Sequence, residues 1–205
     1  TPDMARIETL DGREWIYVPA IPVDVAIIRA TTADPYGNLT FEDEAAVLGT
    51  LDTAVAAHNN GGIVIAQVKR TTTEKHPPRE VHVPGALVDA IVVAPTQEQA
   101  GGIFYDPAIS GTEIKSLDEI ESIGFDITKV IARRAAMELH HYDLANLGFG
   151  ISANVPRILM EEGLDGEVTW VIEQGPVGGF PVTGKAFGAA YNPDAIVASS
   201  DQFIL

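Results

Sequence analysis

The sequence of 205 residues contains no cysteine. A chain without thiols can form no disulfide, no thiolate nucleophile and no thiolate metal site. Its five histidines do not stand at the spacing of a metal-binding motif, so no metal site is predicted. The composition therefore excludes thiol chemistry and gives no sign of a bound metal ion.

Positive charge is scarce as well, with 13 Lys and Arg against 29 Asp and Glu and a formal net charge of −16. Nucleic acids and anionic membrane surfaces bind positively charged faces, so neither is an expected partner. Long hydrophobic runs are also missing, and no window reaches the roughly 18 apolar residues that span a bilayer. The first residues show no basic stretch followed by an apolar one, and we expect a cytoplasmic protein.

Apolar residues, in contrast, make up 46% of the chain, which is enough to build a folded core. Runs rich in β-branched residues predict strands, and apolar residues at helical spacing predict helices. The predicted strands are 23–30, 63–68, 90–94, 144–147 and 167–172, and the predicted helices are 42–60, 128–141 and 155–162. Their alternation indicates an α/β fold with open, mainly parallel sheets.

Acidic residues crowd the start of the first predicted helix. Glu42, Asp43 and Glu44 suit its first turn, because negative charge is stabilised at the positive end of the helix dipole. A packing or domain-contact role for the same three residues is left open.

The stretch 97–116 contains Gly101, Gly102, Pro107 and Gly111 and has no sustained hydrophobic period. Such segments are typical of the junctions between compact units. We therefore expect one unit over residues 1–115 and a second over residues 116–205.

Two glycine-rich turns follow strands that are predicted to be neighbours. One contains Gly148 and Gly150, and the other, residues 173–179, ends with Gly178 and Gly179. In open α/β sheets ligands bind beyond the carboxyl ends of the strands, which makes these turns candidate binding sites. A Gly-x-Gly after a strand also forms a plain tight turn into a helix. Dinucleotide binding is not predicted, since the third glycine of that fingerprint is replaced by alanine at position 153.

Glu173 stands between an apolar strand and the glycines of the second turn. A desolvated carboxylate held against a thioester can attack it and form a covalent acyl intermediate. The neighbouring glycines would offer backbone N–H donors to the developing oxyanion. A helix-capping or ion-paired glutamate is the alternative interpretation of the same residue.

Several motifs, taken in order, resemble the acetate/propionate type of family I coenzyme A transferases. They lie at residues 24–34, 37–38, 41–44, 58–64 and 173–179, the last being Glu173-x-Gly175-Pro176-x-Gly178-Gly179. The resemblance implies two open, mainly parallel α/β CoA-transferase lobes. It covers nearly the whole chain.

This resemblance also implies a chemistry and the residues that perform it. In that family the glutamate of the Glu-x-Gly motif forms a mixed anhydride with the acyl group and then a glutamyl-CoA thioester, which an acceptor carboxylate resolves. Glu173 takes this role by resemblance, and Asn146 matches an active-site asparagine near the acyl and CoA groups. Gly148, Gly150, Gly178 and Gly179 are then expected at the CoA-binding site. Coenzyme A is a substrate, and neither a tightly bound cofactor nor a metal is implied.

Members of that family are longer than this chain, so we expect a central segment of a full-length protein. Residues 1–115 would be the end of the first lobe, and residues 116–205 the beginning of the second. The expected substrates are an acyl-CoA and a short carboxylate such as acetate or propionate. We expect a homo-oligomer or an assembly with chains that supply the missing segments. The alternatives are an acyl-CoA hydrolase that uses the same glutamate and a noncatalytic subunit or fragment completed by other chains.

The densest group of basic residues lies in the polar segment 69–79, which two prolines mark as a surface loop. Its members are Lys69, Arg70, Lys75, His76 and Arg79. They could meet phosphate groups of coenzyme A or simply be solvated. The same two interpretations hold for Lys185.

Overall fold

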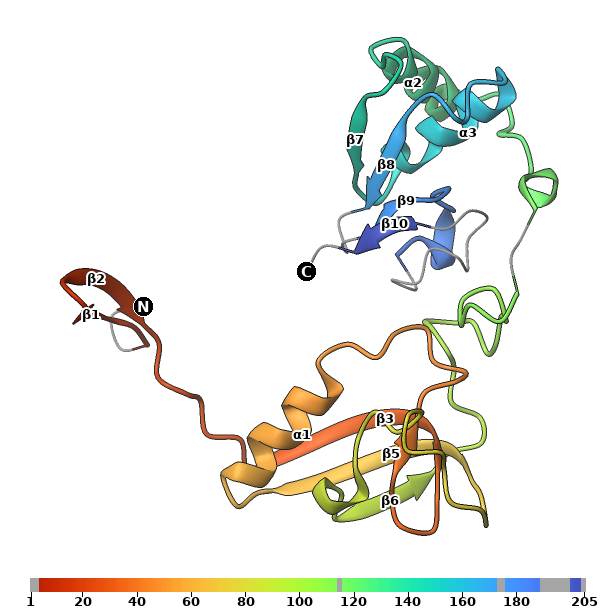
Figure 1. Ribbon diagram of the computed structural model, residues 1–205. Coiled ribbons are helices and arrows are strands. Elements are labelled where there is room, and N and C mark those ends of the chain that lie inside the picture. The colour runs from red at the N-terminus through yellow and green to blue at the C-terminus, as the bar shows by residue number, and fades with distance from the viewer. Residues whose placement is uncertain (1–3, 114–115, 173–175, 189–199, 204–205) are drawn as a thin grey trace.

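The computed structural model describes residues 4–113, 116–172, 176–188 and 200–203. These residues form two four-stranded sheets, each with helices, and a separate two-stranded hairpin (Figure 1). None of the helices in these ranges combines the length and the apolar character needed to cross a membrane.

The first sheet has the strand order β4-β3-β5-β6. β3 (Val25–Ala33), β5 (Ile63–Thr71) and β6 (Ala90–Val93) run parallel, and β4 (Leu39–Thr40) pairs antiparallel with β3. Side chains on β3 and β5 alternate between buried and more exposed positions, as expected when one face of a sheet is covered. Helix α1 (Thr50–Asn59) packs on that face, and the 3₁₀ helix η1 (Gly85–Leu87) precedes β6 (Figure 1).

Small side chains bring α1 close to the first sheet. Ala54 and Ala57 of the helix are fully buried against alternate residues of β3 and β5. The sheet side of this core consists of Ala26, Ile28, Ala30, Val64, Ala66 and Val68. Removal of apolar surface from water stabilises such a layer by about 25 cal/mol per Å². The helix thereby fixes the sheet whose carboxyl ends carry the loops described below.

The second sheet has the order β10-β9-β8-β7. β7 (Leu144–Leu147) and β8 (Thr169–Ile172) are parallel, β9 (Pro176–Gly178) is antiparallel to β8, and β10 (Ser200–Phe203) is antiparallel to β9. Helices α2 (Ile127–Ala136) and α3 (Val155–Glu161) pack on each other and share a core with these strands. Short 3₁₀ helices are η2 (Leu117–Glu119), η3 (Ile151–Asn154) and η4 (Gly184–Ala186).

The predicted α/β class with mainly parallel strands is confirmed, and the antiparallel strands β4, β9 and β10 were not predicted. All five predicted strands occur, although β5 continues to Thr71 into the segment predicted as a loop. Helix α2 ends at Ala136 rather than at residue 141, because the chain turns where His140 N–H donates to the Asp143 carboxylate and Tyr142 adopts a φ of 67°. The two sheets have separate cores. The boundary between residues 115 and 116 stays a prediction, and residues 114–115 lie outside the described ranges.

The acidic first turn predicted for the helix 42–60 is wrong. Helix α1 begins at Thr50, and Glu42, Asp43 and Glu44 precede it in the loop that follows β4. Their carboxylates bond to cationic side chains of β3 and β5 instead of to a helix terminus. These tertiary ion pairs replace the helix dipole as the partner of the three charges.

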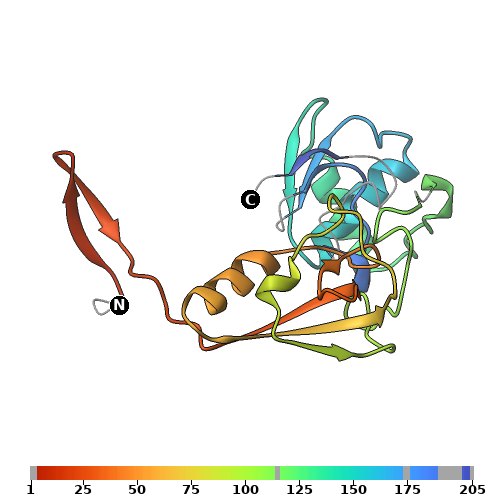
Figure 2. The same ribbon diagram turned by 60° about the horizontal axis from the view of Figure 1, so that its bottom comes forward.

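A hairpin of β1 (Arg6–Leu10) and β2 (Arg13–Tyr17) lies apart from both sheets (Figures 1 and 2). Asp11 and Gly12 join its strands with φ values of 53° and 73°, the two positive angles that a type I′ turn needs. This hairpin was not predicted, although Asp-Gly between two short strands is a strong signal for it.

Candidate functional site

The carboxyl ends of β7 and β8 lie side by side, as the sequence predicted. Leu147 pairs with Ile172, so both strands end at the same level of the sheet. The next residue after Ile172 is Glu173, which lies outside the described residues together with Gln174 and Gly175. The two glycine-rich segments therefore leave one edge of the second sheet.

Asn146 lies in the same cross-strand row as Val171 of β8 and Val177 of β9. Residues in one row point to one face of a sheet. Asn146 is exposed, whereas Val177 is buried. The amide of Asn146 is accordingly available on a face that β8 and β9 continue.

The turn after β7 leads directly into η3 and α3. Gly150 has φ 112° and ψ −138°, a region that residues with a side chain rarely adopt. Ser152 Oγ donates to the carbonyl oxygen of Gly148 at 2.8 Å, and Ala153 N–H donates to that of Gly150 at 3.2 Å. The interpretation of Gly148 and Gly150 as a tight turn into a helix is confirmed, and their contact with coenzyme A stays a prediction.

Gly178 and Gly179 lie farther from this edge than Gly148 does. Gly178 ends β9, which runs antiparallel to β8 with Val177 opposite Val171. The chain thus moves back along β8 as it passes through the two glycines, whose φ values are 82° and 72°. Their expected role at the CoA-binding site is untested.

Apolar rings close the edge of the second sheet. Ile172 is buried in a cluster with Ala153 and Phe187, and the Phe187 ring meets Phe149 edge-on with centroids 5.9 Å apart. Ile172, which precedes Glu173 in the sequence, thus contributes to an apolar cluster at this edge.

Lys185, in η4, was one of the side chains that could meet a ligand. Its ammonium lies beside Gly102, in the loop that follows β6, and a Cβ at that glycine would collide with it. Lys185 therefore contacts the loop of the first sheet. Its predicted alternative, contact with coenzyme A, stays untested.

The corresponding edge of the first sheet, at the ends of β3 and β5, is built from charged groups. Glu44 is buried, accepts from Arg29 Nε at 2.7 Å and accepts from the amide of Gln97 at 2.8 Å. Asp43 accepts from Lys69 at 3.2 Å and from Arg70 at 2.7 Å. The loop after β4 is therefore tied to the strands by three neighbouring carboxylates, the third being that of Glu42.

Burial and hydrogen bonding shift the pKa values of these carboxylates in opposite directions. Burial raises the pKa of Glu44 despite its contact with Arg29. Burial also acts to raise the pKa of Glu42, but hydrogen bonds from Thr32 and Thr40 outweigh it and lower that pKa. Hydrogen bonds from Arg70 lower the pKa of Asp43.

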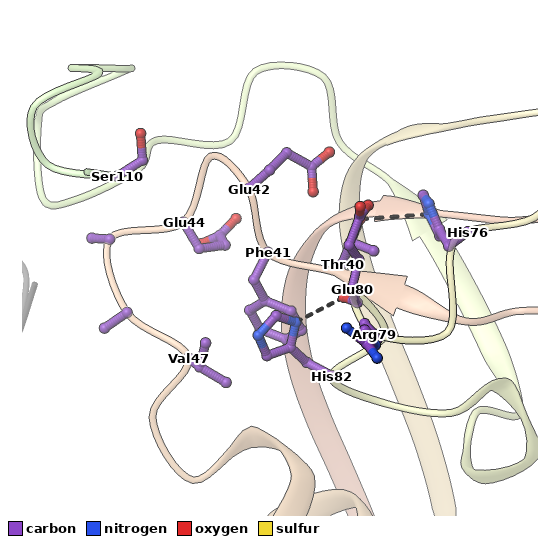
Figure 3. A pocket seen from close by; sticks show the side chains of 12 residues that line it. Thr40, Phe41, Glu42, Glu44, Val47, His76, Arg79, Glu80, His82 and Ser110 are labelled. Atoms are coloured by element: carbon purple, nitrogen blue, oxygen red, sulfur yellow. Dashed lines mark hydrogen bonds between the residues drawn. The ribbon is translucent and has the colours of Figure 1, made fainter. Parts of the chain in front are cut away.

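A pocket of about 780 Å³ opens beside this loop (Figure 3). Its walls come from the segment after β3, the segment after β5 and one residue of the loop that follows β6. The lining residues are Thr40, Phe41, Glu42, Glu44, Ala45, Ala46, Val47, His76, Arg79, Glu80, His82 and Ser110. The described residues contain no group of three or more His, Asp or Glu side chains that could hold a metal ion.

The basic residues of the segment 69–79 separate into two groups. Lys69 and Arg70 are held by the carboxylates described above, so the structure gives them a structural role. Lys75 lies over the Tyr36 ring, with its Nζ 5.2 Å from the ring centroid. His76 and Arg79 line the pocket.

Comparison with known proteins agrees with this architecture. Residues 2–94 match the family model described as Coenzyme A transferase. Caffeate CoA-transferase of Acetobacterium woodii is 41% identical, over 100% of this chain and 40% of the relative. Acetate CoA-transferase YdiF of Escherichia coli K12 is 39% identical, over 98% of this chain and 38% of the relative.

Solved structures give the same relationship. The apoenzyme of acyl-CoA transferase YdiF from Escherichia coli O157:H7 matches with a TM-score of 0.72 and 33% identity, covering 100% of this chain and 36% of that chain. The thioester complex of this enzyme with CoA matches with a TM-score of 0.67 and 38% identity, covering 87% and 34%. The chain belongs to the coenzyme A transferase family.

As a member of the coenzyme A transferase family, the chain spans about 40% of the length of the curated relatives it matches. Motifs on both sheets had already indicated the family. The pocket was not predicted, although the sequence contained a signal for it. Two of its walls are formed by segments that follow the carboxyl ends of parallel strands. Ligands bind beyond such ends in open α/β sheets, and the same rule led to the turns after β7 and β8.

Proposed function

We propose that this chain carries the catalytic glutamate of an acyl-CoA:carboxylate CoA-transferase. The observation that supports this most directly is the pairing of Leu147 with Ile172, which brings the Asn146 strand and the residue before Glu173 to one edge of a sheet. Membership of the coenzyme A transferase family supports the reaction class. Residues 1–115 and 116–205 are proposed to belong to the two lobes.

In the proposed reaction a carboxylate oxygen of Glu173 attacks the thioester carbonyl of the acyl-CoA. The carbon–sulfur bond breaks, and the CoA thiolate leaves an enzyme-bound mixed anhydride. The thiolate then attacks the glutamyl carbonyl, releases the acyl group as a carboxylate and forms a glutamyl-CoA thioester. An acceptor carboxylate reverses the two steps. Asn146 and the backbone of Gly148, Gly150, Gly178 and Gly179 are proposed to position the acyl and CoA groups.

A short-chain carboxylate such as acetate or propionate is the proposed acceptor. The names of two relatives, an acetate and a caffeate CoA-transferase, support an organic carboxylate as the substrate class. We propose the cytoplasm as the location. We also propose a homo-oligomer or an assembly in which further protein completes the site, since the relatives are much longer than this chain.

Trapping of the intermediate tests the role of Glu173. The protein, in the assembly that turns over, is incubated with propionyl-CoA and treated with hydroxylamine or borohydride, and the modified residue is mapped by mass spectrometry. We expect modification at Glu173 and none in Glu173→Gln. Glu167→Gln, which changes a glutamate before β8, is the matched control and should keep the adduct. Adduct formation at another residue would overturn the assignment.

A product assay separates the alternative functions. With propionyl-CoA and acetate, a transferase forms acetyl-CoA and propionate. A hydrolase that uses the same glutamate releases free CoA without acetyl-CoA. A noncatalytic subunit gives neither product.

A further inference from the structure

One side of the first sheet is apolar and open to solvent. On β3 and β5 every second side chain is buried on the side of α1, and the residues between them point to the opposite side. Three aliphatic residues on that side, Val25, Ile27 and Ile63, are 51%, 76% and 52% exposed. With their neighbours on the three strands they form the open face, which consists of Val25, Ile27, Ile63, Ile65, Ala90 and Val92.

The open face belongs to a parallel sheet, and parallel sheets are normally covered on both sides. β3, β5 and β6 run parallel, and α1 lies along one side of the sheet (Figure 1). Among the helices of the described ranges, α1 is the one that packs closely on β3 and β5. The described chain therefore supplies one of two covering layers. Aliphatic side chains gathered on the other side mark a contact with further protein.

The carboxyl end of this side of the sheet is already closed by the loop that follows β6. Arg29 and Gln67 share a cross-strand row beyond the residues of β3 and β5 in the open face. The Arg29 guanidinium donates to the carbonyl oxygens of Glu98 and Gln99 at 2.9 and 2.8 Å. The Gln67 amide donates to Oε1 of Gln97 at 3.1 Å. The uncovered part of β3 and β5 is therefore the part that precedes this row.

The open face has the dimensions of one helix. Three neighbouring strands span ~10 Å, because strands lie about 4.8 Å apart. The distance along β3 from Val25 to Arg29 is about 13 Å, at roughly 3.3 Å per residue. A helix is about 10 Å wide, and roughly nine of its residues cover that length. Between two and three turns of an amphipathic helix would thus bury the open face.

Two carboxylates border the open face at its amino end. Asp24 precedes Val25 and Asp89 precedes Ala90, and both aspartates are exposed. Asp89 accepts a hydrogen bond from the Val64 N–H at 2.8 Å. Within the described ranges neither aspartate forms an ion pair with a lysine or an arginine. A lysine or arginine at one end of the covering helix would match this border.

The sheet type and the charge of the chain favour a helix of further protein over a second copy of this chain. Helices, rather than second sheets, cover the faces of parallel sheets. Two copies joined through their open faces would bring four aspartates together, in molecules that each carry a net charge of −16. The curated relatives are also much longer, since this chain spans about 40% of their length.

We propose that the open face docks an amphipathic helix of further protein, with the helix's aliphatic residues on Ile27 and Ile63 and its lysine or arginine beside Asp24 and Asp89. The proposal rests on the assembly that the proposed function invokes, in which further protein completes the chain. It concerns a surface and no reacting group. A failure of docking therefore leaves the role of Glu173 to be decided by the trapping experiment.

A designed helical peptide tests the proposal on the 205-residue chain. The fluorescently labelled probe has about 16 residues, with leucine at the i, i+3, i+4 and i+7 spacing and lysine in its last turn. A scrambled peptide of the same composition is the control probe. Fluorescence anisotropy should show saturable binding of the amphipathic peptide and none of the scrambled one. Equal binding of the two peptides, or binding of neither, would overturn the proposal.

Variants of the chain locate the bound peptide. Ile27→Asp should weaken binding about tenfold or more, because it places a charge in the centre of the open face. Ile16→Asp, which changes a β2 residue that is 78% exposed, is the matched control and should bind as the unchanged protein does. Ile27→Thr keeps a β-branched side chain and should weaken binding less than Ile27→Asp. Circular dichroism checks the fold of all three. Unchanged binding by Ile27→Asp, or equal losses in Ile27→Asp and Ile16→Asp, would contradict docking on the open face.

Two further measurements test the charge match and the identity of the occupant. A probe with glutamate in place of its lysines should bind more weakly, and tighter binding of this acidic probe would reject the role of Asp24 and Asp89. In sedimentation equilibrium without peptide, the unchanged protein and Ile27→Asp should have the same mass. A dimer that Ile27→Asp dissociates would show that a second copy covers the open face, which would overturn the proposal.

Discussion

At the ends of β3 and β5 the loops are held by charged side chains, whereas at the ends of β7 and β8 they are held by rings and by glycine conformations. Asp34, Asp43 and Glu44 each accept two or more hydrogen bonds at the first edge. At the second edge Ile172 packs against Phe187, and Gly150 takes a backbone conformation closed to most residues. The same position in two parallel sheets is thus built in two ways.

The carboxylates of the first edge are held by several donors and maintain structure. A carboxylate held by several donors is a weak nucleophile, because those donors stabilise its charge. At the second edge Ile172 belongs to an apolar cluster with Ala153 and Phe187. The donors of the first edge agree with a structural role for Asp43 and Glu44, and the reactivity of Glu173 stays a prediction.

The largest expected effect tests the apolar construction of the second unit. Trp170 is 2% exposed, and its indole N–H has no hydrogen-bond partner in the described structure. Trp170→Ala should lower the free energy of unfolding by about 4 kcal/mol, because it leaves a cavity. Trp170→Phe should cost far less, since it removes no hydrogen bond. Urea unfolding followed by circular dichroism measures the free energy of unfolding of both variants. Equal losses in the two variants would contradict apolar packing as the main contribution of Trp170 to stability.

The next effect tests the charged construction of the first edge. Arg29→Met removes a partner from Glu44, whose side chain is 4% exposed. We expect a loss of about 2–3 kcal/mol, less than for a fully buried pair because solvent reaches Arg29. Arg133→Met is the matched control. It breaks an exposed pair with Glu162 and should cost about 0.5 kcal/mol.

A double variant decides whether the buried charge causes this loss. Adding Glu44→Gln to Arg29→Met removes the uncompensated carboxylate and should restore much of the stability. No recovery would mean that lost packing of the arginine, and not the charge, explains the effect.

Asp34 gives the first edge a pH dependence. Burial acts to raise the pKa of Asp34, but hydrogen bonds from Asn38 and from the backbone N–H groups of His76 and Tyr36 lower it from 3.8 to about 2. Because the folded pKa is depressed, this stabilisation is present above pH 3.8 and is lost as the pH falls through 2. Asp34→Asn should cost about 1–2 kcal/mol at pH 7. The difference between the two proteins should shrink between pH 4 and pH 2, and a constant difference would contradict the mechanism.

The smallest expected effect concerns the glycine turn of the second edge. Gly150→Ala forces a side chain into a φ of 112° and should cost about 1 kcal/mol. Gly124→Ala is the control, since no positive φ and no close neighbour is found at that glycine. Thermal unfolding of both variants measures the difference. Equal melting temperatures would show that the turn relaxes without strain.

Local sequence patterns predicted the strands, whereas contacts between residues far apart in the sequence determined where helix α1 begins. The β-branched runs of β3 and β5 were recognised because their burial pattern follows directly from residue type. The start of α1 was misplaced because Glu42, Asp43 and Glu44 bond to residues far away in the sequence, such as Arg70. No local pattern contains that information.

The candidate sites were predictable to different degrees. Family motifs predicted Asn146 and Glu173 as site residues, which stays a prediction, and the pairing of β7 with β8 brings their strands to one edge. The pocket depends on three segments that only the folded chain brings together, among them Phe41, Arg79 and Ser110. Its lining could not be assembled from spacing alone.

The β1–β2 hairpin has a practical consequence for solution studies of this chain. Ile7 and Ile16 are 68% and 78% exposed, and the hairpin packs on neither sheet (Figure 2). A two-stranded hairpin without a covered face is at best marginally stable in water. Its amide hydrogens should therefore exchange with solvent rapidly and slow down when another protein surface covers them. Deuterium uptake at residues 6–17 would thus report the arrival of a partner without any added label.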